Sequence, residues 1–291
     1  MKNRVLRANS MLLCSALIWG TTFVAQRVGM EHMGPLTFNG IRFAMGAMAL
    51  FPVLLFLKRR RARTPVPGAY LVRGGIAMGL VLFLGAWLQQ FGLCFTTAGK
   101  AGFLTGLYVV FVPLVGIFLQ HRYGLGTWAG AALTILGMYL LSVTEALTMS
   151  QGDVLVVVSA FFWGLHVLII DHWGKGLDAV DSVTLCAVQF ALCSGASLAS
   201  ALIFETIAWE SIRNALIPIL YSGLMSVGVG YTFQVVAQRD ARPASAAIIL
   251  SLEAVFAVVA GWIVLDETLT IRAMLGCTLM LSGMIWSQAR P

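Results

Sequence analysis

Charged side chains are scarce in this sequence. Of its 291 residues only 11% are Asp, Glu, Lys or Arg, while 59% are apolar, and the mean hydropathy is +0.88. Soluble domains average about 25% charged and about 45–50% apolar residues. Spread along this length, the apolar excess predicts many membrane-spanning segments rather than a soluble domain or a single anchor.

Patterns for metals, disulfides and nucleotides are missing as well. The five cysteines are scattered through apolar runs without a CxxC pair, and the four histidines show no metal-ligand spacing. We therefore expect no metal, no disulfide and no cofactor. The sequence has no GxxxxGK[ST] nucleotide-binding motif. It also has no A-x-A-like cleavage site after its first apolar run, so we interpret that run as a retained helix.

Ten apolar stretches are long enough to cross about 30 Å of hydrocarbon as helices. Polar or Gly/Pro-rich breaks separate them, and the loops are too short for a soluble domain. This pattern predicts an all-α integral membrane protein with ten transmembrane helices. The expected spans are residues 8–29, 35–57, 70–95, 100–120, 127–147, 152–172, 180–204, 214–236, 244–265 and 271–288.

Basic residues concentrate on one side of these spans. If the N-terminus is cytoplasmic, alternate loops place 14 of the 19 Lys and Arg on that side, including "KRRRAR" at 58–63. Loops on the opposite side carry acids such as Glu31 and Glu205. This positive-inside asymmetry predicts that both the N- and the C-terminus are cytoplasmic, and it explains the basic run without nucleic-acid binding.

The chain contains an internal repeat. "ALIWGTTF", with Trp19 and Gly20, returns as "AFFWGLHV", with Trp163 and Gly164. Other pairs of segments match at the same offset of about 145 residues, so we expect two five-span halves, 1–149 and 150–291. Because five is odd, the second half enters the membrane from the opposite side. The sequence therefore predicts inverted repeats about a pseudo-two-fold axis, an arrangement typical of secondary transporters.

Several motifs resemble a known family. They are "ALIWGTTFVAQRVG" at 16–29, Arg42, "TTAGKAGFLTGL" at 96–107 and "SAAIILSLEAVFAVVAGWIVLDETLTIRAMLGCTLMLSGM" at 245–284. Together they look like the EamA family of the drug/metabolite transporter superfamily, over essentially the whole chain. The resemblance implies ten helices and movement of small metabolites across a bacterial cell (inner) membrane. The family often has Pro after the Glu of the last motif, where Ala254 stands here.

Four side chains are expected near the middle of the membrane. From the helix rise, Trp19 and Trp163 lie about 16 Å into their spans, Glu253 about 14 Å and Tyr108 about 12 Å. Trp19 matches Trp163 in the repeat, and Tyr108 matches Glu253. Residues related in this way can converge on the pseudo-two-fold axis, where we expect a central cavity.

Glu253 is the most informative of the four. An ionisable group at this depth costs at least about 2.5–3.5 kcal/mol, so it is expected to face a cavity or a partner. It could bind an amine, carry a proton, or hold helices together. The tryptophans either pack against the glycines that follow them or form an aromatic wall for apolar, aromatic or cationic groups. Tyr231 and Phe23 would extend that wall.

Three further polar residues are candidates. His166 lies one turn beyond Trp163 on the same helix face, as a substrate contact, a proton relay or a structural hydrogen-bonding group. Gln89 could bond substrate or another helix. Arg42 is expected to snorkel or to pair with acids of the outer side, with an anionic substrate group as the alternative.

The sequence therefore predicts a secondary active or facilitative transporter of a small organic metabolite that works by alternating access. The leading hypothesis is the export of amino acids or related compounds, and the alternative is an organic-cation (quaternary-ammonium) transporter. A membrane-embedded lipid-modifying enzyme is a distant alternative, because its chemistry usually needs clustered acids and the only adjacent pair, Asp266 and Glu267, stands alone. We expect that the protein is not an enzyme and that membrane lipid surrounds it. We also expect it to be a monomer or a homodimer.

Overall fold

The computed structural model describes residues 2–59, 61, 64, 66–96, 98–142, 150–264 and 270–289. Within these residues the regular elements are all helices, which confirms the prediction of an all-α protein. Eight helices are long and apolar enough to cross a membrane. The expected fifth and tenth spans coincide with shorter apolar helices, Leu125–Leu140 and Met274–Ser287. The expected span ends at 147 and 265, and the acids Asp266 and Glu267, lie outside the described residues.

The helices follow the apolar stretches because lipid offers no hydrogen bonds to the backbone, so each spanning segment must satisfy its own amides. Several expected spans are built from two or three consecutive elements. The bounds are α1 (Lys2–Gly29), α2 (Pro35–Arg59), α3 (Gly68–Gly92), α4 (Ala98–Gly106), α5 (Tyr108–Phe118), α6 (Leu125–Ser142), α7 (Gln151–Gly174), α8 (Ala179–Phe204), α9 (Trp209–Asn214), α10 (Leu216–Leu220), the π-helix η1 (Tyr221–Tyr231), α11 (Thr232–Ala237), α12 (Pro243–Leu250), α13 (Glu253–Val264) and α14 (Ile271–Ala289).

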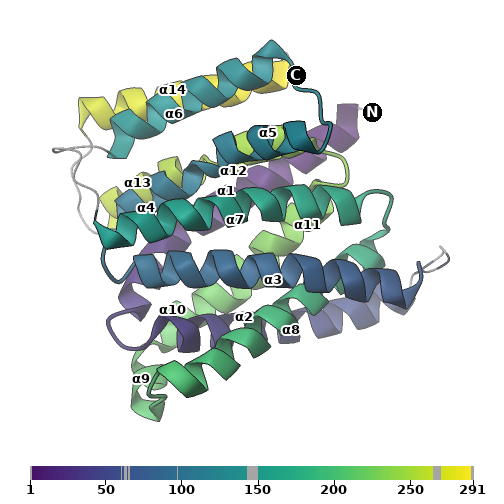
Figure 1. Ribbon diagram of the computed structural model, residues 1–291, viewed down its shortest axis with the longest axis vertical. Helices are drawn as coiled ribbons and strands as arrows, with labels where there is room; N and C mark the ends of the chain where they lie inside the picture. Colours follow the sequence, from purple (N-terminus) through teal and green to yellow (C-terminus); the bar gives the residue numbers. More distant parts are fainter. Residues whose placement is uncertain are drawn as a thin grey trace.

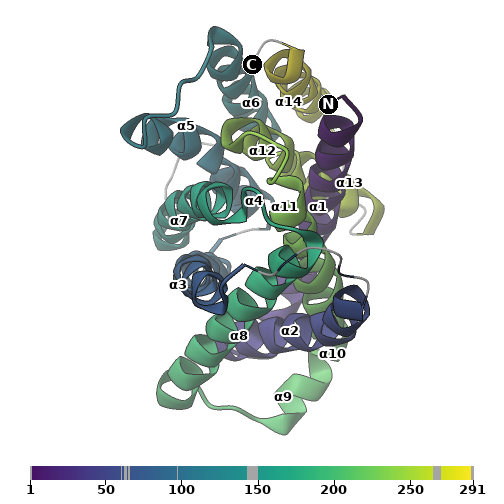
Figure 2. The same cartoon turned by 90° about the vertical axis from the view of Figure 1, so that its right-hand side faces the viewer.

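The long helices lie side by side in a stack (Figure 1). Helices α6 and α14 pack together at one end of the stack, and α2 packs with α8 toward the other end (Figure 2). Between them, α1 packs against η1 and α13, while α7 packs against α3, α4 and α5. Helix α1 begins, and α14 ends, on the same side of the stack, here called the N-terminal face (Figure 1).

Apolar side chains cover much of the outer surface of the stack. Phe51 on α2 is 63% exposed, and Leu202 on α8 and Ile285 on α14 are exposed as well. A soluble monomer rarely exposes large apolar patches. This surface fits the hydrocarbon of a membrane.

Glycines form the contact between α6 and α14. A Cβ added at Gly130 would lie 2.8 Å from the carbonyl oxygen of Gly283, and one at Gly283 would lie 2.7 Å from that of Gly130. A Cβ at Gly137 would lie 2.6 Å from the carbonyl oxygen of Gly276. Small residues of this kind let membrane helices approach closely. The two helices are therefore packed backbone to backbone at two places.

Replacing Gly283 by leucine is expected to separate α6 from α14 and to destabilise the protein by about 1–3 kcal/mol, the usual cost of overpacking. The readout is the unfolding temperature in detergent. Gly195→Leu is the matched control, because Gly195 is also inside a helix but has no atom within 4 Å of an added Cβ. Equal unfolding temperatures for the two variants would contradict this packing.

The α2–α8 pair is fastened at both ends. At one end the Glu205 carboxylate accepts hydrogen bonds from the backbone N–H and the hydroxyl of Thr37, at 2.8 and 2.7 Å. At the N-terminal face the Arg61 guanidinium pairs with Asp178 at 2.9 Å and Asp181 at 2.6 Å. Glu205, just after α8, thus bonds the start of α2, and Arg61, just after α2, bonds the start of α8.

Two of the expected spans are interrupted near their middle. Leu107 separates α4 from α5, and its N–H donates to the carbonyl of Leu104 at 3.2 Å. Ser251 and Leu252 separate α12 from α13, and the N–H of Leu252 donates to the carbonyl of Ile249, also at 3.2 Å. Such bonds, three residues apart, tighten a helix locally. Neither interruption contains a proline.

Candidate functional site

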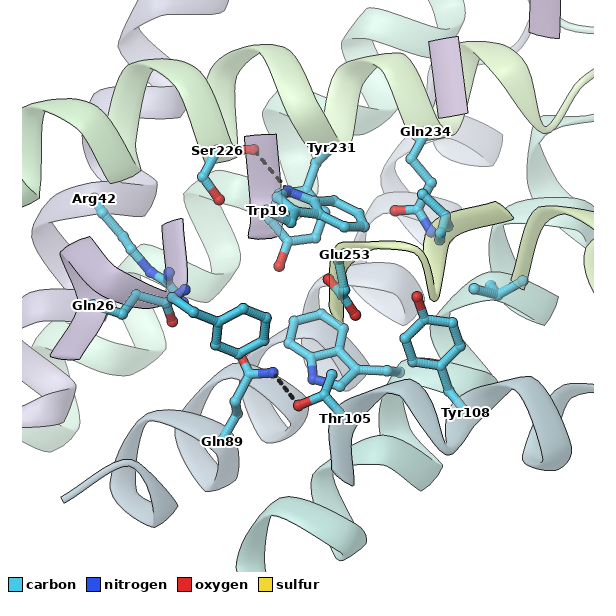
Figure 3. A pocket seen from close by; sticks show the side chains of 14 residues that line it. Trp19, Gln26, Arg42, Gln89, Thr105, Tyr108, Ser226, Tyr231, Gln234 and Glu253 are labelled. Atoms are coloured by element: carbon cyan, nitrogen blue, oxygen red, sulfur yellow. Dashed lines mark hydrogen bonds between the residues drawn. The ribbon is translucent and has the colours of Figure 1, made fainter. Parts of the chain in front are cut away.

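A cavity of about 40 Å³ lies in the centre of the stack, between helices of both sequence halves (Figure 3). One water needs at least about 10–15 Å³ of such space, so the cavity has room for a few waters in this conformation. Seven of the eight predicted binding residues line it, and they come from six of the expected spans. They are Trp19, Phe23, Gln89, Tyr108, Trp163, Tyr231 and Glu253.

Tyr231 joins the two repeated tryptophans. Its ring centroid lies 4.6 Å from that of Trp19 and 6.0 Å from that of Trp163. The indole N–H of Trp19 donates to the carbonyl of Ser226 at 3.3 Å, whereas the buried Nε1 of Trp163 has no partner among the described residues. The tryptophans thus form an aromatic wall with Tyr231 at its centre.

The glycine of each Trp-Gly pair packs against a helix of the opposite sequence half. A Cβ at Gly20 would lie 2.5 Å from the carbonyl oxygen of Glu253 and 2.6 Å from the Cβ of Phe256. A Cβ at Gly164 would lie 3.0 Å from the Cβ of Phe111. In each pair the tryptophan thus lines the cavity, and the glycine admits a neighbouring helix.

The two helix interruptions position Tyr108 and Glu253. Each is the first residue of the helix that follows its break, α5 for Tyr108 and α13 for Glu253. Both side chains are buried, at 4% exposure, and point into the same part of the cavity (Figure 3). The Tyr108 hydroxyl and the Glu253 Oε1 have no hydrogen-bond partner within the described part of the chain. Burying polar atoms without partners is costly, so these two atoms are available to a ligand or water.

The remaining predicted residues differ in their placement. Gln89 lines the cavity and donates from Nε2 to the Thr105 hydroxyl at 2.8 Å. His166 is buried behind the wall: its ring contacts those of Trp163 and Tyr231, and its Nε2 lies 2.8 Å from the Gln189 side-chain oxygen. His166 is thus held by a hydrogen bond and supports the wall from behind.

Sequence reasoning placed Arg42 wrongly. Instead of snorkelling or pairing with an acid of the described residues, its side chain is 2% exposed and lines the cavity. Gln26 and Gln234 also line it, and their Oε1 atoms have no hydrogen-bond partner among the residues described. The sequence did contain a signal for this inward placement. Arg42 lies well inside an apolar span, and such arginines usually face the interior of a helix bundle. The two glutamines gave a weaker form of the same signal.

The chain resembles known proteins along its whole length. Residues 6–143 and 150–287 each match the model of the EamA-like transporter family. An uncharacterized transporter of Archaeoglobus fulgidus is 29% identical over 271 residues, covering 93% of this chain and 82% of that protein. A probable amino-acid metabolite efflux pump of Escherichia coli strain K12 is 25% identical over 286 residues, covering 94% and 91%. One solved crystal structure shares the fold with a TM-score of 0.78 at 16% identity, covering 97% and 96%.

Proposed function

The chain belongs to the EamA-like transporter family and is a membrane transporter, and we propose that it moves a small organic metabolite through the central cavity by alternating access. The observation that carries this proposal is the cavity itself. It lies between helices of both halves and holds buried polar atoms that no described residue satisfies. Secondary transporters with inverted repeats bind substrate near the midplane where the repeats meet.

The two halves are proposed to be inverted repeats, residues 1–149 and 150–291. The family model matches each half separately, which supports this division. Helix α1 packs on η1, α12 and α13, and its counterpart α7 packs on α3, α4 and α5. If the repeats are related by a two-fold axis, these are the same contacts in two copies.

Local details support the same axis. The Gly130–Gly283 contact becomes the Gly276–Gly137 contact when each residue is replaced by its counterpart in the other half. The interruptions at Leu107 and Leu252 are likewise counterparts.

The shared N-terminal face supports placing both chain ends on one side of the membrane, and the basic loops favour the cytoplasmic side (Figure 1).

We propose export of amino acids or related compounds as the task. A relative that is named a probable amino-acid metabolite efflux pump aligns with 94% of the chain, which supports this class of substrate. An organic-cation transporter is the second candidate. It is favoured by the aromatic wall beside the free Glu253 oxygen, since ring faces and a carboxylate both attract cations.

A ligand screen followed by flux tests the proposal. Thermal shifts of the detergent-purified protein are measured with amino acids, amines, nucleosides and sugar phosphates, and each compound that binds is then tested in proteoliposomes with and without a pH gradient. We expect amino acids to raise the unfolding temperature and to be carried. A flux that follows the pH gradient would support proton coupling, with Glu253 and His166 as the proposed groups. Binding and flux of none of these compounds would contradict the proposal.

A further inference from the structure

We propose that the cavity is a two-point site for a zwitterion, in which Arg42 binds a free carboxylate of the substrate and Glu253 binds its ammonium group. This inference rests on the proposed transport function and narrows its substrate class. It selects compounds with both charges over amines and quaternary ammonium ions, which carry only one.

The first observation is the isolation of Arg42. Its guanidinium makes no ion pair and no hydrogen bond with any residue of the described chain, and its buried Nε has no partner. Its neighbours are aromatic, with the guanidinium carbon 5.0 Å from the Phe43 ring centroid and 5.6 Å from that of Phe38. Ring faces compensate a buried cation only in part. The N–H donors of this arginine are therefore open to an acceptor that enters the cavity.

The second observation is that the carboxyl group of Glu253 lines the same cavity without pairing with Arg42. Arg42 and Glu253 form no ion pair with each other, although both are buried and both face the cavity (Figure 3). In this view Arg42 lies beside Gln26 on the left, whereas Glu253 lies near the middle, between Tyr231 and Tyr108. A buried arginine and a buried carboxyl group that face one cavity would attract each other if both were ionised. Because they do not pair with each other, each side chain remains open to a ligand group that enters the cavity.

The chemistry at each end fits one group of a zwitterion. Guanidinium donors match the geometry of a carboxylate, and they can hold both of its oxygens. At the other end the free oxygen of Glu253, together with Oε1 of Gln234, can accept hydrogen bonds from an ammonium group. The aromatic wall of Trp19, Trp163 and Tyr231 runs along the cavity and suits an apolar side chain. An α-amino acid with an apolar side chain satisfies all three features.

Two matched pairs of compounds test this inference. L-leucine is compared with L-leucinamide, which lacks the carboxylate, and glycine betaine with choline, which lacks it as well. Binding is followed by the fluorescence of the tryptophans at the cavity and by thermal shift. We expect the wild-type protein to bind the carboxylate-bearing member of at least one pair about 100-fold more tightly than its partner, because an arginine without its anion stays buried and unpaired.

Arg42→Gln is expected to abolish that preference, so that the two members of the pair bind with similar affinity. Arg27→Gln, at an exposed arginine of α1, is the matched control and should leave the preference intact. Because removal of a buried arginine can prevent folding, Arg42→Lys is measured in parallel. It keeps the charge but lacks the planar fork, and we expect it to weaken leucine or betaine binding while the unfolding temperature is retained.

Equal binding of leucine and leucinamide, and of betaine and choline, by the wild-type protein would overturn the inference and leave a cation carrier in its place. Preference for the carboxylate that survives in Arg42→Gln would also overturn it. If the wild-type protein binds none of the four compounds and carries none of the screened metabolites, the proposed function fails together with the inference.

Discussion

Glu253→Gln is expected to lower the flux of an amino-acid substrate about 100-fold or more. The substitution keeps the shape of the side chain and removes its charge, so the ammonium group of the substrate would be buried without a counter-charge. Removing one member of a buried charge pair costs about 3–5 kcal/mol, and each 1.4 kcal/mol is about a factor of ten. The measurement is initial-rate uptake into proteoliposomes at equal protein density.

The matched control for this prediction is Glu210→Gln. Glu210 lies on the short helix α9, its side chain is 78% exposed, and its contact with Arg213 is a loose 3.8 Å. Exposed ion pairs contribute little, so wild-type flux is expected. Tyr108→Phe removes only the neighbouring hydroxyl and should have a smaller effect than Glu253→Gln. Unchanged flux in Glu253→Gln, with the protein folded, would rule out a role for this carboxylate in substrate binding or coupling.

Gly20→Ala is expected to impair the protein more than Gly164→Ala, although the two glycines are counterparts in the repeat. A Cβ at Gly20 would lie 2.5 Å from the Glu253 carbonyl oxygen, so α13 must move and carry Glu253 with it. At Gly164 the nearest atom, the Cβ of Phe111, is 3.0 Å away and needs a smaller displacement. Overpacking costs about 1–3 kcal/mol of folding stability, and the displacement of Glu253 is expected to weaken substrate binding as well.

Two readouts separate packing from function in this pair. The unfolding temperature reports the packing cost of each alanine, and leucine titration by tryptophan fluorescence reports the displacement of Glu253. Gly20→Ala should weaken leucine binding in addition to lowering the unfolding temperature, whereas Gly164→Ala should change both only slightly. If Gly164→Ala proves the more damaging variant, the close approach of α1 to Glu253 does not position the carboxylate.

The positions of the helices and the depth of the site residues could be predicted from the sequence. Hydropathy locates spanning segments because every backbone amide in lipid must be bonded within its own helix. The helix rise then converts a residue number into a depth, which placed Trp19, Trp163, Tyr108 and Glu253 near the middle. All four line the cavity. The internal repeat identified them as two related pairs before any contact was known.

The sequence by itself thus determined an all-α membrane protein and its internal repeat, and it predicted a depth for each candidate site residue. Only the tertiary structure decided which of them face the cavity. It turned Arg42 inward, placed His166 behind the aromatic wall and brought Tyr231 between the two tryptophans. The physical reason lies in the solvent. In lipid both the outer and the inner face of a helix are apolar, so periodicity does not mark the inner face, and its direction is set by packing against distant segments.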